Sequence, residues 1–241
     1  MEHHKVKSGV PGLDAMLSGG FSKNSVVAVA GGTGSGRTIF CSQFLVAGAS
    51  EFEEPGLFIS LDMQKEQLYS NLAAFGWDMA ELERDQLLVF IDYPQNELAS
   101  IAEQEGAMRD LVNTLGIKRV VVDSISPYAL LFSTPEERKM NTLRFVNAVR
   151  GWKATALISA ETVPSHESEV PHTISGVESF ADGLIHLSFL RKGGRRERAL
   201  EIVKMRGSSH EHDIVPAQIT QHGFSVGMMA SKKAKRGPSD E

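Results

Sequence analysis

The sequence is poor in cysteine, in basic charge and in long apolar runs. Cys41 is its single cysteine, so the chain forms no internal disulfide, which is typical of proteins in a reducing cytoplasm. Lys and Arg number 25 against 30 Asp and Glu, and the net charge of -5 is unlike that of a dedicated nucleic-acid or anionic-membrane binder. No apolar run reaches the ~18 residues of a membrane helix, and residues 1–7 contain no apolar stretch of signal-peptide length. We therefore expect a cytoplasmic protein without membrane contact.

The rest of the composition is typical of a globular protein. Hydrophobic residues make up 41% of the 241 residues and charged residues 23%, which excludes a disordered or collagen-like chain. A chain of this length can bury a sizeable core without disulfides. The sequence predicts one domain over residues 1–228, followed by a polar, disordered tail over residues 229–241.

Apolar runs and helical spacings alternate along most of the chain. Short apolar runs predict buried strands at residues 25–31, 57–61, 87–91, 119–123 and 154–160. Helical patterns follow them at residues 38–48, 68–75, 97–115 and 134–149. Strands at 183–190, 199–205, 214–219 and 224–226 come last, with turns at 192–195 and 222–223. The pattern predicts an α/β fold with a mainly parallel sheet flanked by helices and with antiparallel strands at its C-terminal end.

A glycine-rich loop lies between the first predicted strand and its helix. It reads Gly31-Gly32-Thr33-Gly34-Ser35-Gly36-Arg37-Thr38, which fits the phosphate-binding pattern G-x-x-x-x-G-K-[ST] except at the lysine. Glycines let consecutive backbone N–H groups converge on phosphates, and the following helix directs its positive end at them. The Thr38 hydroxyl would ligate Mg²⁺. A glycine-rich turn without a ligand is the less favoured interpretation.

Arginine replaces the lysine of this pattern at position 37. The positive charge is kept, so nucleotide binding is compatible with Arg37, but the longer, planar guanidinium changes the geometry around the transferred phosphoryl group. A second candidate is Asp123, at the end of the run Val120-Val121-Val122. An Asp at the tip of a buried strand beside the loop can hold Mg²⁺ through water, although capping a helix is an equal alternative for this residue taken alone.

Several further segments, taken with the loop, resemble one protein family. They are residues 8–20 (SGVPGLDAMLSGG), 71–78 (NLAAFGWD), 175–183 (SGVESFADG), 204–210 (KMRGSSH) and 219–223 (ITQHG). In this order they resemble the KaiC-like branch of the RecA/RadA superfamily of P-loop ATPases, over about residues 5–227. The resemblance implies a single RecA-like domain that binds ATP and Mg²⁺ at a subunit interface, usually in a hexameric ring.

The resemblance also assigns residues to the neighbouring subunit's nucleotide. Lys204 and Arg206 would contact its phosphates, and His210 of the same motif would complete the nucleotide-binding group. From the residues alone, two cations one residue apart on a strand face the same way, and a solvated strand edge is an equal interpretation.

Two catalytic positions depart from the family pattern. The family usually has two adjacent glutamates after the second strand, one of which polarises the attacking water, whereas this chain has Asp62 and Met63. Asp62 keeps a carboxylate with a shorter reach, and Met63 accepts no proton. General-base catalysis tolerates little displacement. With Arg37, these departures predict slow or absent hydrolysis, with Asp62 as the group that orients water. The resemblance also places Ser159 and Glu161 where the γ-phosphate is sensed.

Other signals favour ordinary structural roles. His210 and His212 lack a third metal ligand at suitable spacing, and Cys41 is expected to be a core residue. The cations of the tail (Lys232, Lys233, Lys235, Arg236) and of the predicted hairpin (Arg195, Arg196, Arg198) are expected to be solvated. The stretch 161–175 contains Glu161, Glu167 and Glu169 and no cation, which would repel DNA phosphates and argues against strand exchange.

The leading hypothesis is a ring-forming, slow or degenerate ATPase that acts as a nucleotide-dependent switch for a protein partner that the sequence does not identify. One alternative is a scaffold that binds nucleotide without hydrolysing it. The other is a recombinase paralogue that assists DNA-bound filaments, although nucleic acid is not favoured as a partner.

Overall fold

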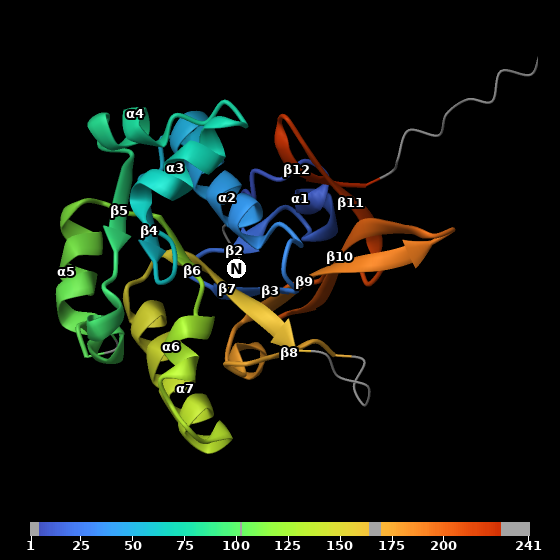
Figure 1. Ribbon diagram of the computed structural model, residues 1–241. Coiled ribbons are helices and arrows are strands. Elements are labelled where there is room, and N and C mark those ends of the chain that lie inside the picture. Colours follow the sequence, from blue (N-terminus) through green and yellow to red (C-terminus); the bar gives the residue numbers. More distant parts are fainter. Residues whose placement is uncertain (1–4, 102, 164–169, 228–241) are drawn as a thin grey trace, which may run out of the picture.

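The protein is built around one mixed sheet. The structure, a computed structural model, describes residues 5–101, 103–163 and 170–227. Within these residues a ten-stranded sheet has the order β12-β11-β10-β9-β3-β7-β6-β4-β5, with β8 paired to β7. Helices pack on both sides of this sheet (Figure 1). The tail predicted over residues 229–241 lies outside the described residues.

The central part of the sheet is parallel. It contains β3 (Val26–Gly31), β4 (Gly56–Ser60), β5 (Leu88–Asp92), β6 (Arg119–Asp123), β7 (Thr155–Val163) and β9 (Gly183–Lys192). The apolar runs of β3, β4 and β6 are buried throughout, as expected for strands covered on both faces. All of these strands end at the same edge of the sheet, so the residues that follow them lie near one another. We call it the carboxyl edge.

The C-terminal part of the sheet is antiparallel, as predicted. It consists of β9 with β10 (Arg195–Met205), β11 (Val215–Thr220) and β12 (Gly223–Val226). The turn between β9 and β10 contains Gly193 and Gly194, whose φ angles of 54° and 77° suit a two-residue hairpin turn. The fold class predicted from the sequence is therefore confirmed.

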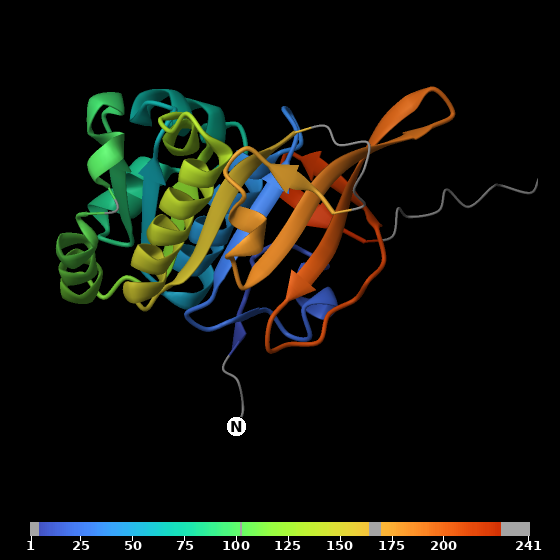
Figure 2. The ribbon, with the colours of Figure 1, turned by 90° about the horizontal axis from the view of Figure 1, so that it is seen from below.

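The helices cover the two faces of the sheet in separate groups. One face carries α2 (Arg37–Phe52), α3 (Lys65–Ala73) and α4 (Met79–Arg84), and the other carries α5 (Glu105–Thr114), α6 (Ser126–Leu130) and α7 (Pro135–Gly151), as Figures 1 and 2 show. Neighbouring residues of β3 alternate between these groups, since Val27 packs with α2 whereas Ala28 packs with α7. Among the described residues, no helix is long and apolar enough to cross a bilayer.

A small N-terminal unit packs beside the C-terminal strands. It contains β1 (Lys5–Val6), α1 (Leu13–Met16) and β2 (Phe21–Ser22). Lys5 Nζ donates to Ser208 Oγ at 2.5 Å, and the Glu211 N–H donates to Met16 O at 2.9 Å. These bonds hold the loop after β10, which carries His210, against the N-terminal unit. Two of the segments that carry the family resemblance, 8–20 and 204–210, also meet directly, since the Ser18 hydroxyl donates to Ser209 O at 3.1 Å.

The predicted continuous helix over residues 97–115 is wrong. This part of the chain contains a 3₁₀ segment, η1 (Gln95–Ser100), and then α5. The Ser100 hydroxyl donates to Glu97 O at 2.9 Å, a local side-chain bond that competes with the helical backbone pattern. The sequence also gave no sign of α4 and α6, because helices of five or six residues are too short to show a periodic apolar stripe.

Candidate functional site

The glycine-rich loop connects β3 to α2 at the carboxyl edge, as predicted. Gly34 and Gly36 have φ angles of 77° and 102°, so side chains other than hydrogen would be strained there. Inside the loop, the Ser35 N–H donates to Gly32 O at 3.1 Å. A Cβ atom added at Gly34 would meet nothing within 4 Å, so this side of the loop is open to an incoming group.

The loop fits a phosphate group. The first N–H groups of α2 have no carbonyl partner within the helix, and together with the helix dipole they favour an anion. Ser35 Oγ is buried and has no hydrogen-bond partner among the described residues, although a buried hydroxyl normally has one. Thr38 is the second residue of α2, so its hydroxyl belongs to the same helix start.

The Arg37 side chain bends back onto its own loop. Its Nη1 donates to the carbonyl oxygen of Gly31, at the end of β3. This guanidinium therefore satisfies a backbone acceptor, whereas the lysine of the usual pattern would be free to reach phosphates. Retaining the charge does not retain the lysine geometry.

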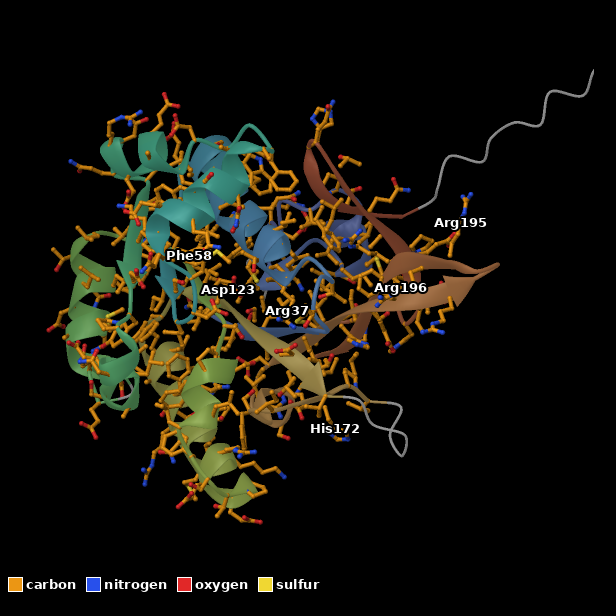
Figure 3. All side chains as sticks on the ribbon, in the orientation of Figure 1. Arg37, Phe58, Asp123, His172, Arg195 and Arg196 are labelled. Carbon is orange, nitrogen blue, oxygen red and sulfur yellow. The ribbon has the colours of Figure 1, made fainter. Side chains whose placement is uncertain are left out.

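Asp123 lies at the same edge, at the end of β6. Its side chain is 6% exposed, and the Ser159 hydroxyl on the neighbouring strand β7 donates to its Oδ1. Figure 3 shows Arg37 and Asp123 in the same central part of the molecule, and both influence the thiol of Cys41 electrostatically. Thr38, Asp123 and Ser159 thus share the edge that the sequence assigned to Mg²⁺ and phosphate.

Asp62 follows β4 at this edge. Partial desolvation by the surrounding protein, added to the negative charge of Asp123, raises the pKa of Asp62 to about 6, although the residue as a whole is exposed at the surface. The positive charge of Arg37 acts in the opposite direction. An acid with a pKa near neutrality is suited to exchange protons with water.

Met63 is held by the backbone and the core. Its N–H donates to Ser60 Oγ at 3.1 Å, and its side chain packs against the apolar cluster beneath α2 and α3. It therefore supplies an apolar wall beside Asp62 and no second carboxylate, as the sequence predicted.

Glu161 reaches the loop from β7. Its Oε1 accepts a hydrogen bond of 2.8 Å from the Thr33 hydroxyl, and its N–H donates to Ser126 Oγ at 3.0 Å. The two residues that the sequence associated with γ-phosphate sensing, Ser159 and Glu161, thus lie on one side of β7 and contact opposite parts of the site.

Lys204 and Arg206 lie at the other end of the sheet. Met205 pairs with Gly183, whose row is four residues, or about 13 Å, from the row that contains Gly31. Lys204 Nζ donates to Glu178 O at 2.6 Å, next to the 3₁₀ segment η2 (Val177–Ser179). Burial, added to the nearby charge of Arg206, lowers the pKa of Lys204. Neither cation contacts the glycine-rich loop of its own chain.

Three other candidates have local partners. Arg206 Nη1 lies 3.9 Å from Asp182 Oδ1. His210 Nδ1 is 3.0 Å from Glu211 O, and its ring centroid lies 4.6 Å from that of His212. Cys41 is fully buried in the core, and burial raises the pKa of its thiol well above its usual value. Glu167, Glu169 and the cations of the tail lie outside the described residues.

The sequence missed the residues that connect the loop to the C-terminal strands. Arg198 was expected to be solvated, but its Nη2 donates to Gly34 O at 3.1 Å, because β10 passes directly beside the loop. Gln43, on α2, donates to Gly9 O at 2.8 Å and accepts from the Phe224 N–H at 2.6 Å. A polar residue inside the apolar run of α2 was the available signal for Gln43, whereas Arg198 had none.

No group of three or more His, Cys, Asp or Glu side chains forms a preassembled metal site within the described part of the chain. A Mg²⁺ ion bound together with a nucleotide needs no such cage, because it keeps waters and takes phosphate oxygens as ligands. Thr38 and Asp123 provide oxygen donors of the type that Mg²⁺ prefers.

Comparison with known proteins agrees with this geometry. Residues 6–231 match the family model described as the KaiC ATPase. A UPF0273 protein of Methanopyrus kandleri is 32% identical over 240 residues, covering 94% of this chain and 93% of that protein. The solved structure of a KaiC-like protein from Pyrococcus horikoshii superposes with a TM-score of 0.81 at 29% identity, covering 93% of this chain and 99% of that one.

The circadian clock oscillator protein KaiC of Synechococcus elongatus is also similar. It is 29% identical over 230 residues, which cover 92% of this chain but 44% of the clock protein. This chain therefore corresponds to less than half of that protein. The chain belongs to the KaiC family of ATPases, with a RecA-like P-loop fold.

Proposed function

We propose that this member of the KaiC family binds ATP with Mg²⁺ at the interface between copies of itself in a hexameric ring, and that it hydrolyses the ATP slowly. The loop amides and Arg37 would hold the phosphates, and Thr38 and Asp123 would hold Mg²⁺, which neutralises phosphate charge when bound. Asp62 would orient the attacking water. Ser159 and Glu161 would sense the γ-phosphate.

One observation carries this proposal, namely the separation of the two halves of the site. The loop, Asp62 and Asp123 share the carboxyl edge, whereas Lys204 and Arg206 lie about 13 Å away along the sheet. Both cations have partners away from their own loop, Glu178 O for Lys204 and Asp182 for Arg206, so we infer that they would serve a nucleotide bound by a neighbouring copy. His210, on the loop held by the N-terminal unit, would join the same neighbouring site.

Slow turnover follows from two side chains at the site. Arg37 is engaged by Gly31 O, so phosphate binding by its guanidinium competes with a bond to its own loop. Met63 leaves Asp62 as the single carboxylate at the end of β4. Misplacement of a catalytic group by about 1 Å can cost ~100-fold in rate.

Slow hydrolysis suits a switch. A ligand that binds the assembled state stabilises it by mass action, so ATP would hold the ring together and its loss would release it. A protein partner in the cytoplasm that reads the assembled state would then respond to nucleotide. The partner is not identified by any feature of the described residues.

The test is ATP hydrolysis by the purified protein with Mg²⁺, followed over hours. We expect turnover that falls to background in both Thr38→Ala and Asp123→Asn, because each removes a Mg²⁺ ligand. Turnover that persists in both variants would overturn the assignment of the site.

A scaffold that binds nucleotide without hydrolysing it is the second candidate, and the bond between Arg37 and Gly31 O favours it. It predicts ATP recovered intact from the protein after hours with Mg²⁺, and an assembly that still requires Thr38. Measuring bound nucleotide and assembly in the same samples separates the two candidates.

A further inference from the structure

The hairpin of β9 and β10 projects beyond the rest of the sheet. β9 pairs with β3 only as far as Leu187, and β10 pairs with β11 only from Arg198 to Leu200. Within the described residues, positions 188–197 therefore form a two-stranded ribbon whose outer edges are unpaired. Figures 1 and 2 show it extending away from the body of the protein.

This ribbon, which we call the arginine ribbon, carries more positive than negative charge, since Glu197 is its one carboxylate within positions 188–197. Its guanidinium groups are those of Arg191, Arg195, Arg196 and, at its base, Arg198. Among the described residues, no carboxylate lies within 4.0 Å of any of them. Arg191 and Arg196 are direct cross-strand partners, and like charges in such a pair destabilise a hairpin. The pairing of these two charges therefore does not benefit the folding of the ribbon.

An aromatic ring lies among these cations. The guanidinium of Arg196 lies 4.3 Å from the centroid of Phe189, and that of Arg198 lies 5.3 Å from it. Because side chains alternate along a strand, Phe189, Arg191, Arg196 and Arg198 share one face of the ribbon. Contact with the ring restrains the Arg196 guanidinium and leaves its N–H donors for another acceptor, whereas Arg198 already donates to Gly34 O.

We propose that this face of the arginine ribbon binds nucleic acid through its phosphates. Arginines at alternate positions supply donors for a row of phosphates, and the stacked guanidinium planes offer surfaces on which unpaired bases can stack. A two-stranded ribbon also has a shape that fits the DNA major groove. An acidic peptide would use the charges but not the stacked planes, so it is the less favoured ligand.

The negative net charge of the chain does not oppose this local site. Screening limits the reach of exposed charges to about 10 Å at ordinary salt concentrations. The ribbon projects from the body, so the nearest phosphates would experience its arginines more than the distant carboxylates. Arg195 and Arg196 lie out on the ribbon, well away from Asp123 (Figure 3).

The experiment measures fluorescence anisotropy of a labelled 20-nucleotide oligothymidine and of a labelled 20-base-pair duplex, with the full chain. The test variant is Arg191→Gln/Arg196→Gln, which removes the cross-strand pair on this face. The matched control is Lys23→Gln/Lys153→Gln, which removes two exposed cations from the opposite edge of the sheet. Urea midpoints and ATP binding are compared first, to show that both variants fold.

We expect the ribbon variant to bind at least one of the two nucleic acids at least about tenfold more weakly, and the control to bind within about twofold of the parent protein. For the single strand, two phosphate contacts, one each from Arg191 and Arg196, correspond to a slope of about -1.4 in log affinity against log salt. If the protein binds the single strand but not the duplex, the result would indicate that bases stack on the arginines. If it binds the duplex but not the single strand, the result would indicate binding in the DNA groove.

Three results would overturn the proposal. One is absence of binding to both nucleic acids at 50 mM salt or below. Another is an equal loss of nucleic-acid affinity in the ribbon variant and in the control variant, or a loss of affinity that occurs only when residues 231–241 are removed. The third is tighter binding of poly-glutamate than of either nucleic acid, which would identify an acidic protein segment as the ligand. Because ATP binding is measured in the same ribbon variant and should be unchanged, failure of this proposal can be distinguished from failure of the proposed ATPase function.

Discussion

Arg119 and Arg37 differ greatly in the number of contacts that hold their guanidinium groups. Arg119, the first residue of β6, is 1% exposed and fully engaged. Its Nε lies 2.6 Å from Glu54 Oε2, and its Nη1 donates to Lys7 O at 2.9 Å and to Phe44 O at 2.8 Å. Its guanidinium also lies 4.6 Å from the Phe44 ring centroid and 5.2 Å from that of Phe52.

Arg37 lies at the opposite end of the parallel strands and has far less to hold it. The structure gives its half-buried guanidinium a bond to Gly31 O. No ring is stacked on it among the described residues, and no carboxylate there lies within 4.0 Å. The comparison teaches that an arginine with a structural role is held by many contacts, whereas Arg37, which we propose to bind phosphate, keeps the freedom to change partners.

The largest expected effect comes from removing the engaged arginine. Arg119→Met keeps most of the apolar stem but leaves Lys7 O, Phe44 O and the Glu54 carboxylate without their donor. We expect a loss of about 2–4 kcal/mol in the free energy of unfolding. Arg37→Met, the matched variant, should change it by no more than about 0.5 kcal/mol.

Urea unfolding followed by tryptophan fluorescence measures both variants. A loss of similar size in the two would mean that Arg37 is also a structural residue, and the contrast between the two ends of the sheet would be wrong.

A smaller effect is expected from restoring the residues that the family usually has at positions 37 and 63. Arg37→Lys combined with Met63→Glu restores a compact ammonium and a second carboxylate beside Asp62. We expect ATP turnover to rise at least about tenfold, because positioning of catalytic groups limits the rate. Adding Thr38→Ala should abolish the gain. An unchanged rate in the double variant would show that these two positions do not limit hydrolysis.

The smallest effect concerns the charge of Asp62. The pKa of about 6 in the folded protein lies above the ~3.9 of an unperturbed Asp, so ionised Asp62 destabilises the fold above pH 6. This destabilisation is lost as the pH falls from 6 towards 4. Asp62→Asn should therefore unfold at a higher urea concentration than the parent protein at pH 7.5, and the difference should shrink at pH 4.

ATP turnover should also depend on the ionisation of Asp62, but here the ionised form is the favourable one. Protonated Asp62 cannot orient water as a base, so the rate should fall as the pH is lowered through about 6. A flat rate between pH 5 and pH 8 in the parent protein would contradict the role given to Asp62.

The sequence correctly predicted those helices and strands whose local pattern of apolar residues matches their burial in the folded protein. The runs that became β3 and the centre of β6 are apolar, and the helix expected over residues 134–149 is present as α7, with a capping box of Thr134 and Glu137 at its start. The helix predicted over residues 97–115 failed because side-chain bonds of Ser100 decide that segment locally, which periodicity does not reveal.

The residues of the candidate site also divide into those that the sequence predicted and those that it did not. The loop follows β3, Asp62 follows β4 and Asp123 ends β6. Because these strands are parallel, the location of all three at one edge of the sheet was predictable from the order of the elements. The bond between Arg198 and Gly34 O was not, because it depends on where a hairpin distant in sequence crosses the loop. Nor did the sequence distinguish Arg119 from any other strand residue, since its partners come from three separate segments.

In the proposed assembly, the distance between the loop and Lys204 would also govern how copies join. A contact that brings one to the other is head-to-tail, so it gives the assembly a direction. An open row of n copies then has n-1 complete sites, with an unused loop at one end and unused cations at the other. Closure removes both ends at once, and a geometry that misses closure continues as a helical filament. The angle between neighbours, more than the strength of any contact, would decide which of the two forms.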